Sequence, residues 1–252
     1  MTLPDAYKNM LSELQSNTIT DEFNRLSIRG NVFNRTVNGR KVQHWEQNTI
    51  DAVIVKTAPI SRQYYAGEYS EGKTSPPTCW ATANTGKPSE DVKTSNVQSN
   101  TCFDCPQNIK GSGGGRGRAC RYLQRIAVIL VDNDNKISDK DVCQLQLPAT
   151  SVFGDHKHKM ALQTYARFLD SKKAPLASVL TRISFDEASV TPKLYFRPVR
   201  PLEEFEFLIA SRVQKNPKTK KLIEFNFRPQ QDNHVSKMFE PVVGEGVFIY
   251  KK

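Results

Sequence analysis

The residues best suited to chemistry in this chain are four cysteines near its middle. Cys79 is followed by Cys102 and Cys105 in a C-x2-C pattern, and then by Cys120. Zn²⁺ prefers four tetrahedral ligands, and a C-x2-C turn supplies two thiolates at a suitable spacing. The segments between these cysteines are rich in Gly, Ser, Thr and Asn, so they are unsuited to burying a hydrophobic core of their own. The pattern therefore predicts a structural zinc site with these four thiolates as ligands.

Disulfide bonds and inert buried thiols are the alternatives to zinc. The chain has five cysteines, and its first residues lack the apolar stretch of a secretory signal, which disfavours disulfides. The fifth cysteine, Cys143, has a different setting because it alternates with Leu145 and Leu147. That alternation predicts a buried position in a strand, where a thiol behaves as a small hydrophobic group.

The formal net charge of +10 favours a polyanionic partner such as nucleic acid. One basic run without acids spans 110–125, and a second spans 212–221. In the first run, glycines interleave with arginines, a composition that offers backbone N–H groups and guanidinium groups to phosphate. An ordinary solvated loop is the alternative for both runs, and we expect the second at a hairpin tip. No apolar run approaches the ~20 residues of a membrane span, so a cytoplasmic protein is expected.

Aromatic residues recur beside the basic ones around the cysteines. Proteins that bind single strands combine aromatic faces that stack on bases with cations that follow the phosphates. Core packing is the alternative for each aromatic, and it is favoured for Tyr195, Phe225 and Phe227, which belong to strand-like patterns. The candidate nucleic-acid-binding residues are Arg62, Tyr64, Tyr65, Trp80, Phe103, Lys110, Arg116, Arg118, Arg121 and Arg125.

The remaining sequence indicates many short strands and few helices. Helices are expected over 4–16, 20–26 and 156–170, the last capped by Asp155. An Asn38-Gly39 turn predicts a hairpin. Strands are expected over 27–32, 41–45, 51–55, 126–131, 142–147, 178–185, 193–197, 204–213 and 220–227, the last two joined by a turn at 215–218.

These elements predict a mainly β (α+β) fold, an OB-like Greek-key barrel with one internal helix and short N-terminal helices; a β-sandwich is the alternative. We expect a single domain over 1–252, with a helical appendage at 1–28 and an irregular, cysteine-rich zinc insert at 59–120.

The stretch from Ile60 to Leu147 resembles a group of bacteriophage single-stranded DNA-binding replication proteins, some of which are cofactors of phage DNA or RNA polymerases. The resemblance rests on ISRQYY followed by PPTCW, on CFDCPQN followed by GSGGGRGRAC, and on LQLPATS. It implies an OB-type core, the four cysteines as metal ligands, and a turn after the knuckle at Pro106, Gly111 and Ser112. The chain departs from many single-strand binders at 247–252, which is apolar and basic rather than acidic.

The sequence thus predicts a non-enzymatic phage protein that coats and protects single-stranded DNA during replication, largely independently of sequence, in the cytoplasm of the infected bacterial host. Zn²⁺ is its expected structural cofactor, and a phage DNA or RNA polymerase is a possible further partner. The main alternative is a transcription cofactor that holds an opened promoter for a phage RNA polymerase.

A zinc nucleobase deaminase is a weaker alternative, with His44 and Glu46 as its H-x-E motif and the C-x2-C as remaining ligands. Thr101 stands where that motif has Pro, the H-x-E lies in a predicted strand, and Cys79 and Cys120 would have no role.

Overall fold

The computed structural model describes residues 24–29, 31–37, 40–45, 47–67, 76–82, 85–115, 117–132, 134, 136–154 and 159–225. The strands are β1 (Arg25–Arg29), β2 (Val32–Val37), β3 (Arg40–Trp45), β4 (Thr49–Thr57), β5 (Ser61–Tyr64), β6 (Cys79–Thr82), β7 (Arg121–Val131), β8 (Ile137–Pro148), β9 (Val179–Phe185) and β10 (Leu194–Pro201). The helices are α2 (Ala149–Val152), α3 (Leu162–Ser171), α4 (Glu204–Lys215) and α5 (Pro217–Ile223), with 3-10 turns η1 (Thr94–Asn96), η2 (Pro106–Asn108) and η3 (Leu176–Ser178).

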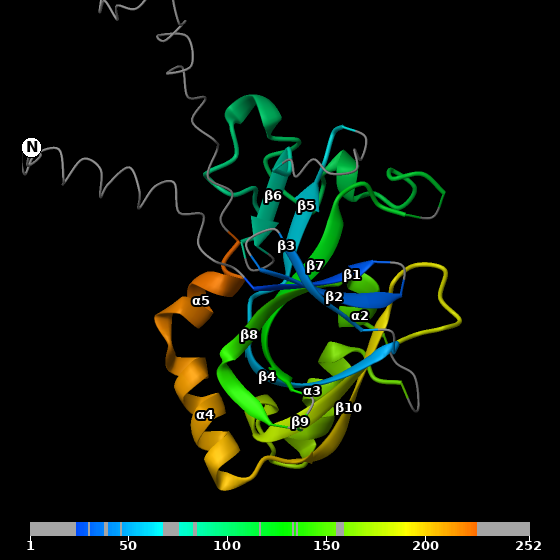
Figure 1. Ribbon diagram of the computed structural model, residues 1–252. Coiled ribbons are helices and arrows are strands. Elements are labelled where there is room, and N and C mark those ends of the chain that lie inside the picture. The colour runs from blue at the N-terminus through cyan, green and yellow to red at the C-terminus, as the bar shows by residue number, and fades with distance from the viewer. Residues whose placement is uncertain are drawn as a thin grey trace, which may run out of the picture.

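The described strands form one mixed, ten-stranded sheet, which confirms the mainly β prediction. Its main path runs β10-β9-β4-β7-β8-β1-β2-β3, and β5 and β6 branch from it beside β7. Neighbours are antiparallel except β1 and β8, which pair in parallel. The sheet curls strongly, and the branch of β5, β6 and the first part of β7 rises above it (Figure 1). In the described residues the ladder ends at β10 and at β3, so the sheet is open.

The central strands are buried on both faces, which explains their continuous apolar runs. In β4, Ala52 and Ile54 join one hydrophobic cluster, while Val53 and Val55 join a second cluster on the opposite face. Helix α3 adds Tyr165 and other residues to the first cluster. Helices α4 and α5 cover the second cluster with Ala210, Val213, Leu222 and Ile223.

The predicted strand over 27–32 is divided in the structure. Its first part belongs to β1 and its last residue begins β2, because Asn31 adopts a left-handed conformation with φ of 59° and turns the chain. Strands β2 and β3 form the predicted hairpin, while Asn38 and Gly39 themselves lie outside the described residues. Residues 25–28, expected to belong to a helical appendage, lie in β1, and the helix predicted over 4–16 is outside the described part.

The hairpin predicted over 204–227 is wrong, because residues 204–223 form helices α4 and α5. Capping residues at the ends of these segments explain why they are helical. At the start of α4, Glu203 and Glu206 form a reciprocal capping box. The side chain of Asn216 then caps α5, with Pro217 at its first position. The predicted helix over 156–170 is also shorter in the described residues, where α3 begins at Leu162.

The insert predicted at 59–120 is less irregular than expected, since it contains β5 and β6. Strand β5 pairs with β6 and also with the first residues of β7, which links the insert to the main sheet. The two ends of the insert meet beside each other. The amide of Ala58 donates to the carbonyl of Arg125 at 2.8 Å, and the side chain of Gln124 donates to the carbonyl of Ala58 at 2.9 Å.

Candidate metal centre and nucleic-acid surface

Three separate pieces of chain bring the four predicted cysteine ligands together. Cys79 begins β6, Cys102 and Cys105 lie just before η2, and Cys120 directly precedes β7. The pairing of β6 with β5, and of β5 with β7, places Cys79 on one side of β5 and Cys120, just before β7, on the other. The sheet therefore sets two corners of the site, and the C-x2-C turn supplies the other two.

Backbone hydrogen bonds hold the C-x2-C turn against this sheet. The amide of Cys102 donates to the carbonyl of Gly86 at 2.8 Å, and the amide of Cys120 donates to the carbonyl of Gln107 at 2.7 Å. The side-chain amide of Asn108 also donates to the carbonyl of Cys102 at 2.8 Å. The turn is thus fixed on both sides by hydrogen bonds that use no thiol, which leaves the sulfur atoms available.

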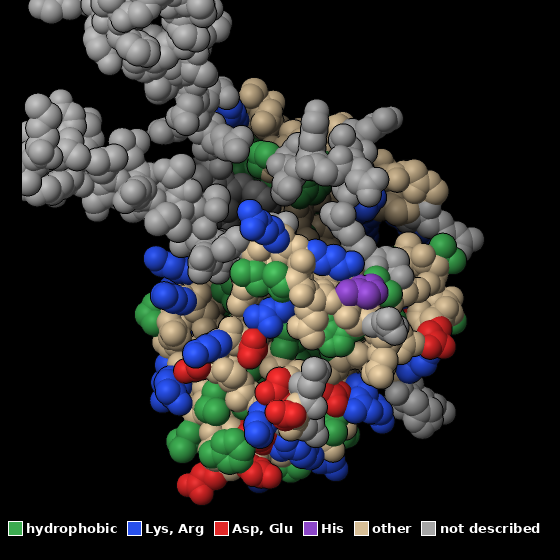
Figure 2. Space-filling view, viewed as in Figure 1, with side chains coloured by type: hydrophobic (Ala, Val, Ile, Leu, Met, Phe, Trp, Pro, Cys, Tyr) green, Lys and Arg blue, Asp and Glu red, His purple; other side chains and the backbone are tan. Residues whose placement is uncertain are grey.

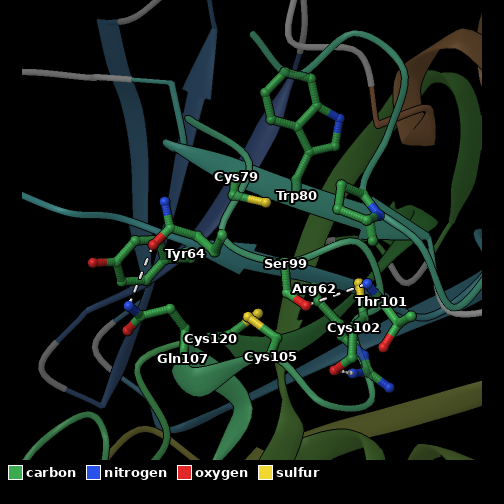
Figure 3. Close-up of a pocket in the computed structure, with 13 residues that line it drawn as sticks. Arg62, Tyr64, Cys79, Trp80, Ser99, Thr101, Cys102, Cys105, Gln107 and Cys120 are labelled. Atoms are coloured by element: carbon green, nitrogen blue, oxygen red, sulfur yellow. Dashed lines mark hydrogen bonds between the residues drawn. The ribbon is translucent and has the colours of Figure 1, made fainter. Parts of the chain in front are cut away.

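All four cysteines line one small pocket, and their sulfur atoms stand around its centre (Figure 3). The enclosed volume is about 10 Å³, the size of a single water-sized sphere, so the pocket suits an ion rather than an organic ligand. No Asp, Glu or His among the described residues lines it. Sulfur-only donors suit zinc or an iron–sulfur cluster. In the described part of the chain, no three Cys, His, Asp or Glu residues form a ready metal-binding group, so the thiols share a pocket without a preformed coordination sphere.

Burial favours the protonated form of these thiols. It raises the pKa of Cys79 and Cys102, and it raises the pKa of Cys120 to about 11. Neighbouring thiols, Cys105 among them, add to the increase because thiolates repel one another, whereas the Arg62 guanidinium opposes it at Cys102 and Cys120. A divalent cation would reverse this balance by attracting the thiolates.

The glycine run after the knuckle folds back on itself. The amides of Gly111 and Gly113 donate to the carbonyl of Gly117 at 2.7 and 3.3 Å, and Gly117 donates to Gly114. A side chain at Gly113 would place its Cβ 2.7 Å from the backbone of Arg118, so this glycine allows a close approach. The expectation that this run offers free backbone N–H groups to phosphate is wrong for these amides, because the loop uses them internally.

Two of the predicted basic residues also serve the fold. Arg62 donates to the carbonyl of Cys102 at 3.0 Å, and its guanidinium lies over the ring of Tyr122 at 4.4 Å. Arg125 is half-buried, donates to the carbonyl of Glu224 at 2.6 Å, and lies over the ring of Phe225 at 4.3 Å. Burial lowers the pKa of Arg125 to about 10. Arg62 therefore braces the C-x2-C turn against β7, and Arg125 holds the segment after α5 against β7.

Two predicted aromatic residues pack into the insert. Trp80 is only 6% exposed and clusters with Cys79 and Val92, and the half-buried Tyr64 packs against this cluster. Core packing therefore accounts for both. Tyr65 is half-exposed, and its hydroxyl donates to Gln63 at 2.6 Å.

The remaining described candidates lie on the surface of the insert. Phe103 is 86% exposed inside the C-x2-C turn, and Lys110, Arg118 and Arg121 are also exposed. Arg118 donates to the side chain of Asn108 at 3.1 Å, the same residue that braces Cys102. Arg116 lies outside the described residues. Hydrogen bonds through Asn108 thus link the C-x2-C turn, which carries the exposed Phe103, to the exposed Arg118 of the glycine loop.

Sequence reasoning missed the two residues that connect these parts. Tyr122 supports Arg62 from β7, and Asn108 joins the knuckle to the glycine loop. Both contacts depend on how β5 pairs with β7 and how the loop closes, so no local sequence pattern marks them. Cys143 is fully buried in β8, as predicted.

The arrangement gives no support to the deaminase alternative. His44 lies in β3, where its Nδ1 is 2.9 Å from the side-chain oxygen of Asn34, and it does not line the cysteine pocket. Glu46 is outside the described residues.

Comparison with protein families, curated proteins and solved structures finds no significant match to this chain. Among the described helices, none has the length and apolar character needed to cross a membrane.

Proposed function

We propose that this protein binds single-stranded DNA through its cysteine-rich insert, coating the strand with little sequence preference. The carrying observation is the exposed Phe103 in the C-x2-C turn, whose neighbour Cys102 is linked through Asn108 to the exposed Arg118. The exposed Lys110 and Arg121 lie on either side of this loop in the sequence. The aromatic face would stack on a base, and the cations would contact phosphates. The net charge of +10 supports attraction to a polyanion.

In this proposal, Cys79, Cys102, Cys105 and Cys120 hold a structural Zn²⁺. Four thiolates close a tetrahedral site, leaving no open position for a reacting water, so the metal would stiffen the insert rather than catalyse. The small pocket with sulfur-only donors fits such an ion. We further propose that the curled sheet is a variant of the OB fold. The protein would be encoded by a phage and would act in the cytoplasm of the infected bacterium. A phage DNA polymerase, or an RNA polymerase at an opened promoter, would be a further partner.

Fluorescence-anisotropy titration of the zinc-loaded full chain with single- and double-stranded oligonucleotides tests the proposal. Binding should favour the single strand, and its affinity should fall with salt by about 0.7 log units of Kd per log unit of salt for each phosphate contact. Phe103→Ala should weaken binding by about 1–3 kcal/mol without changing the salt slope. The matched control Phe168→Ala, on the surface of α3, should bind as the unmodified protein does.

The basic residues give a separate measurement. Replacing Arg118 and Arg121 together by Ala should reduce the salt slope by about 1.4 if each contacts one phosphate. Arg167→Ala, an exposed arginine on α3, is the control and should leave the slope unchanged. Preference for duplex, or an affinity that ignores salt, would contradict the proposal. Normal binding by all insert variants would place the nucleic acid on another surface.

A further inference from the structure

Helix α4 presents an apolar outer face that the described part of the chain leaves uncovered. Leu208 is 61% exposed, Phe205 is 56% exposed, and Phe207 is also exposed. The inner face of the same helix packs on the sheet through Ala210 and Val213. Exposed apolar side chains gathered on one helix face, rather than scattered singly, are typical of a contact surface.

Charges of opposite sign flank this apolar face along the helix. Glu203 and Glu204 are exposed at its start, and Arg212 and Lys215 are exposed near its end. Figure 2 shows this order over α4, with acidic side chains at the lower end, hydrophobic ones between, and basic ones above. The only described ion pair of Arg212 is a long contact of 3.8 Å to the exposed Asp139. From the start of α4 to its end, the exposed face is therefore first acidic, then apolar and then basic.

We infer that α4 docks against α4 of a second copy of this chain, in an antiparallel arrangement about a two-fold axis at Leu208. Glu204 and Arg212 each lie four residues from Leu208, about 6 Å along the helix axis in opposite directions. Reversing one helix against the other therefore places Glu204 of each copy beside Arg212 of its partner. A two-fold interface requires such self-complementarity, since the same patch serves both copies.

Helical geometry supports the same pairing around the helix. At 100° per residue, one quarter of the helix circumference contains positions 204, 208, 212 and 215. Phe205 lies at the edge of this quarter. The two copies of Leu208 would meet at the centre, and the ring of Phe205 would lie beside the partner's Arg212. Neither nucleic acid nor metal contributes to this contact, so it is independent of the proposed function.

The contact area sets the expected strength. Helix α4 has 12 residues and is about 18 Å long. A contact strip of that length and about 10 Å width covers far less area than a stable interface, which buries about 800 Å² on each partner. We therefore expect a weak dimer in rapid exchange, with a Kd of about 10 μM or weaker. Two such copies on one DNA strand would hold adjacent stretches of it.

Sedimentation velocity of the full chain without DNA, over about a hundredfold range of concentration spanning this Kd, tests the dimer. The sedimentation coefficient should rise with concentration. Leu208→Asp should abolish the rise, because it places two carboxylates opposite each other at the centre. Val190→Asp, at a fully exposed apolar residue between β9 and β10, is the matched control and should dimerise normally. Circular dichroism verifies that each variant is folded.

A charge exchange tests the antiparallel register itself. Glu204→Lys and Arg212→Glu should each weaken the dimer by about tenfold, because each turns two attractive pairs into repulsive ones. Mixing these two variants should restore association, since each contact between positions 204 and 212 in the mixed dimer then joins one cation to one carboxylate. A chain that stays monomeric at every concentration overturns the inference. So does a dimer indifferent to Leu208→Asp, or one that mixing fails to restore.

Discussion

Zinc binding should release protons in a number that the buried thiols determine. Cys79, Cys102 and Cys120 all have a raised pKa, and that of Cys120 is about 11. An ordinary thiol has a pKa of about 8.5, so at pH 7 each of these three groups carries its proton almost completely. A thiol must lose its proton to bind zinc. Binding at pH 7 should therefore release at least about three protons.

The same count fixes the pH dependence of zinc affinity. Each proton released lowers the affinity tenfold for each unit by which the pH falls, so three protons give a loss of about a thousandfold between pH 7 and pH 6. Isothermal titration calorimetry of the metal-free chain, in two buffers of different ionisation enthalpy, measures the proton number directly. Competition with a chelator at the two pH values measures the affinity.

Matched alanine variants separate this site from the remaining cysteine. Cys105→Ala should lose most of the zinc affinity and release fewer protons. Cys143→Ala removes a thiol that is buried in β8 with a pKa of about 12, and should leave both measurements unchanged. Release of only about one proton, or an equal loss of zinc in both variants, would refute the four-thiolate site.

Two further perturbations test the structure around the site and the cap of α4. Gly113→Ala should open the glycine loop to protease and lower its local stability by about 1–3 kcal/mol, because its Cβ would lie 2.7 Å from backbone atoms of Arg118. Gly67→Ala, with nothing within 4 Å, is the control and should be digested as the unmodified protein is. Glu206→Ala should lower the free energy of unfolding by about 2–3 kcal/mol in urea titrations, since Glu206 is buried and accepts two hydrogen bonds from Arg200. Those hydrogen bonds lower the pKa of Glu206, so the stabilisation is present above pH of about 4.3 and lost as the pH falls through the lower folded pKa.

The central strands were predictable because their side chains leave little choice. Apart from Asp51, the runs over 51–55 and 126–131 are apolar and mostly β-branched, and such runs favour strands buried on both faces. The spacing of the four cysteines likewise predicted a shared zinc site; the four side chains line one pocket, and zinc binding there stays a prediction. In both cases the residues that form the sequence pattern are the same residues that pack together in the structure.

The wrong secondary-structure predictions arose where one sequence pattern was compatible with both a strand and a helix. Residues 204–207 alternate Glu204 and Glu206 with Phe205 and Phe207, which imitates a strand, although the helix buries Glu206 instead. The capping residues at 203 and 216 were the better guide to α4 and α5. The inward roles of Arg62 and Arg125 could not be predicted, since each depends on a partner about 40 residues or more away in the sequence.

The first and last residues of the insert lie beside each other, so the insert can vary in length without changing the main sheet. Ala58 is hydrogen-bonded to Arg125 and Gln124, so the start and the end of the insert lie beside each other, and β5 attaches the insert to β7. The antiparallel pairing of β4 with β7 already brings these ends together. The entropy of closing a loop grows slowly, by about 0.6 kcal/mol for each doubling of its length. The loops of the segment between Ala58 and β7 can therefore change in length at little entropic cost, while the strand order of the main sheet stays the same.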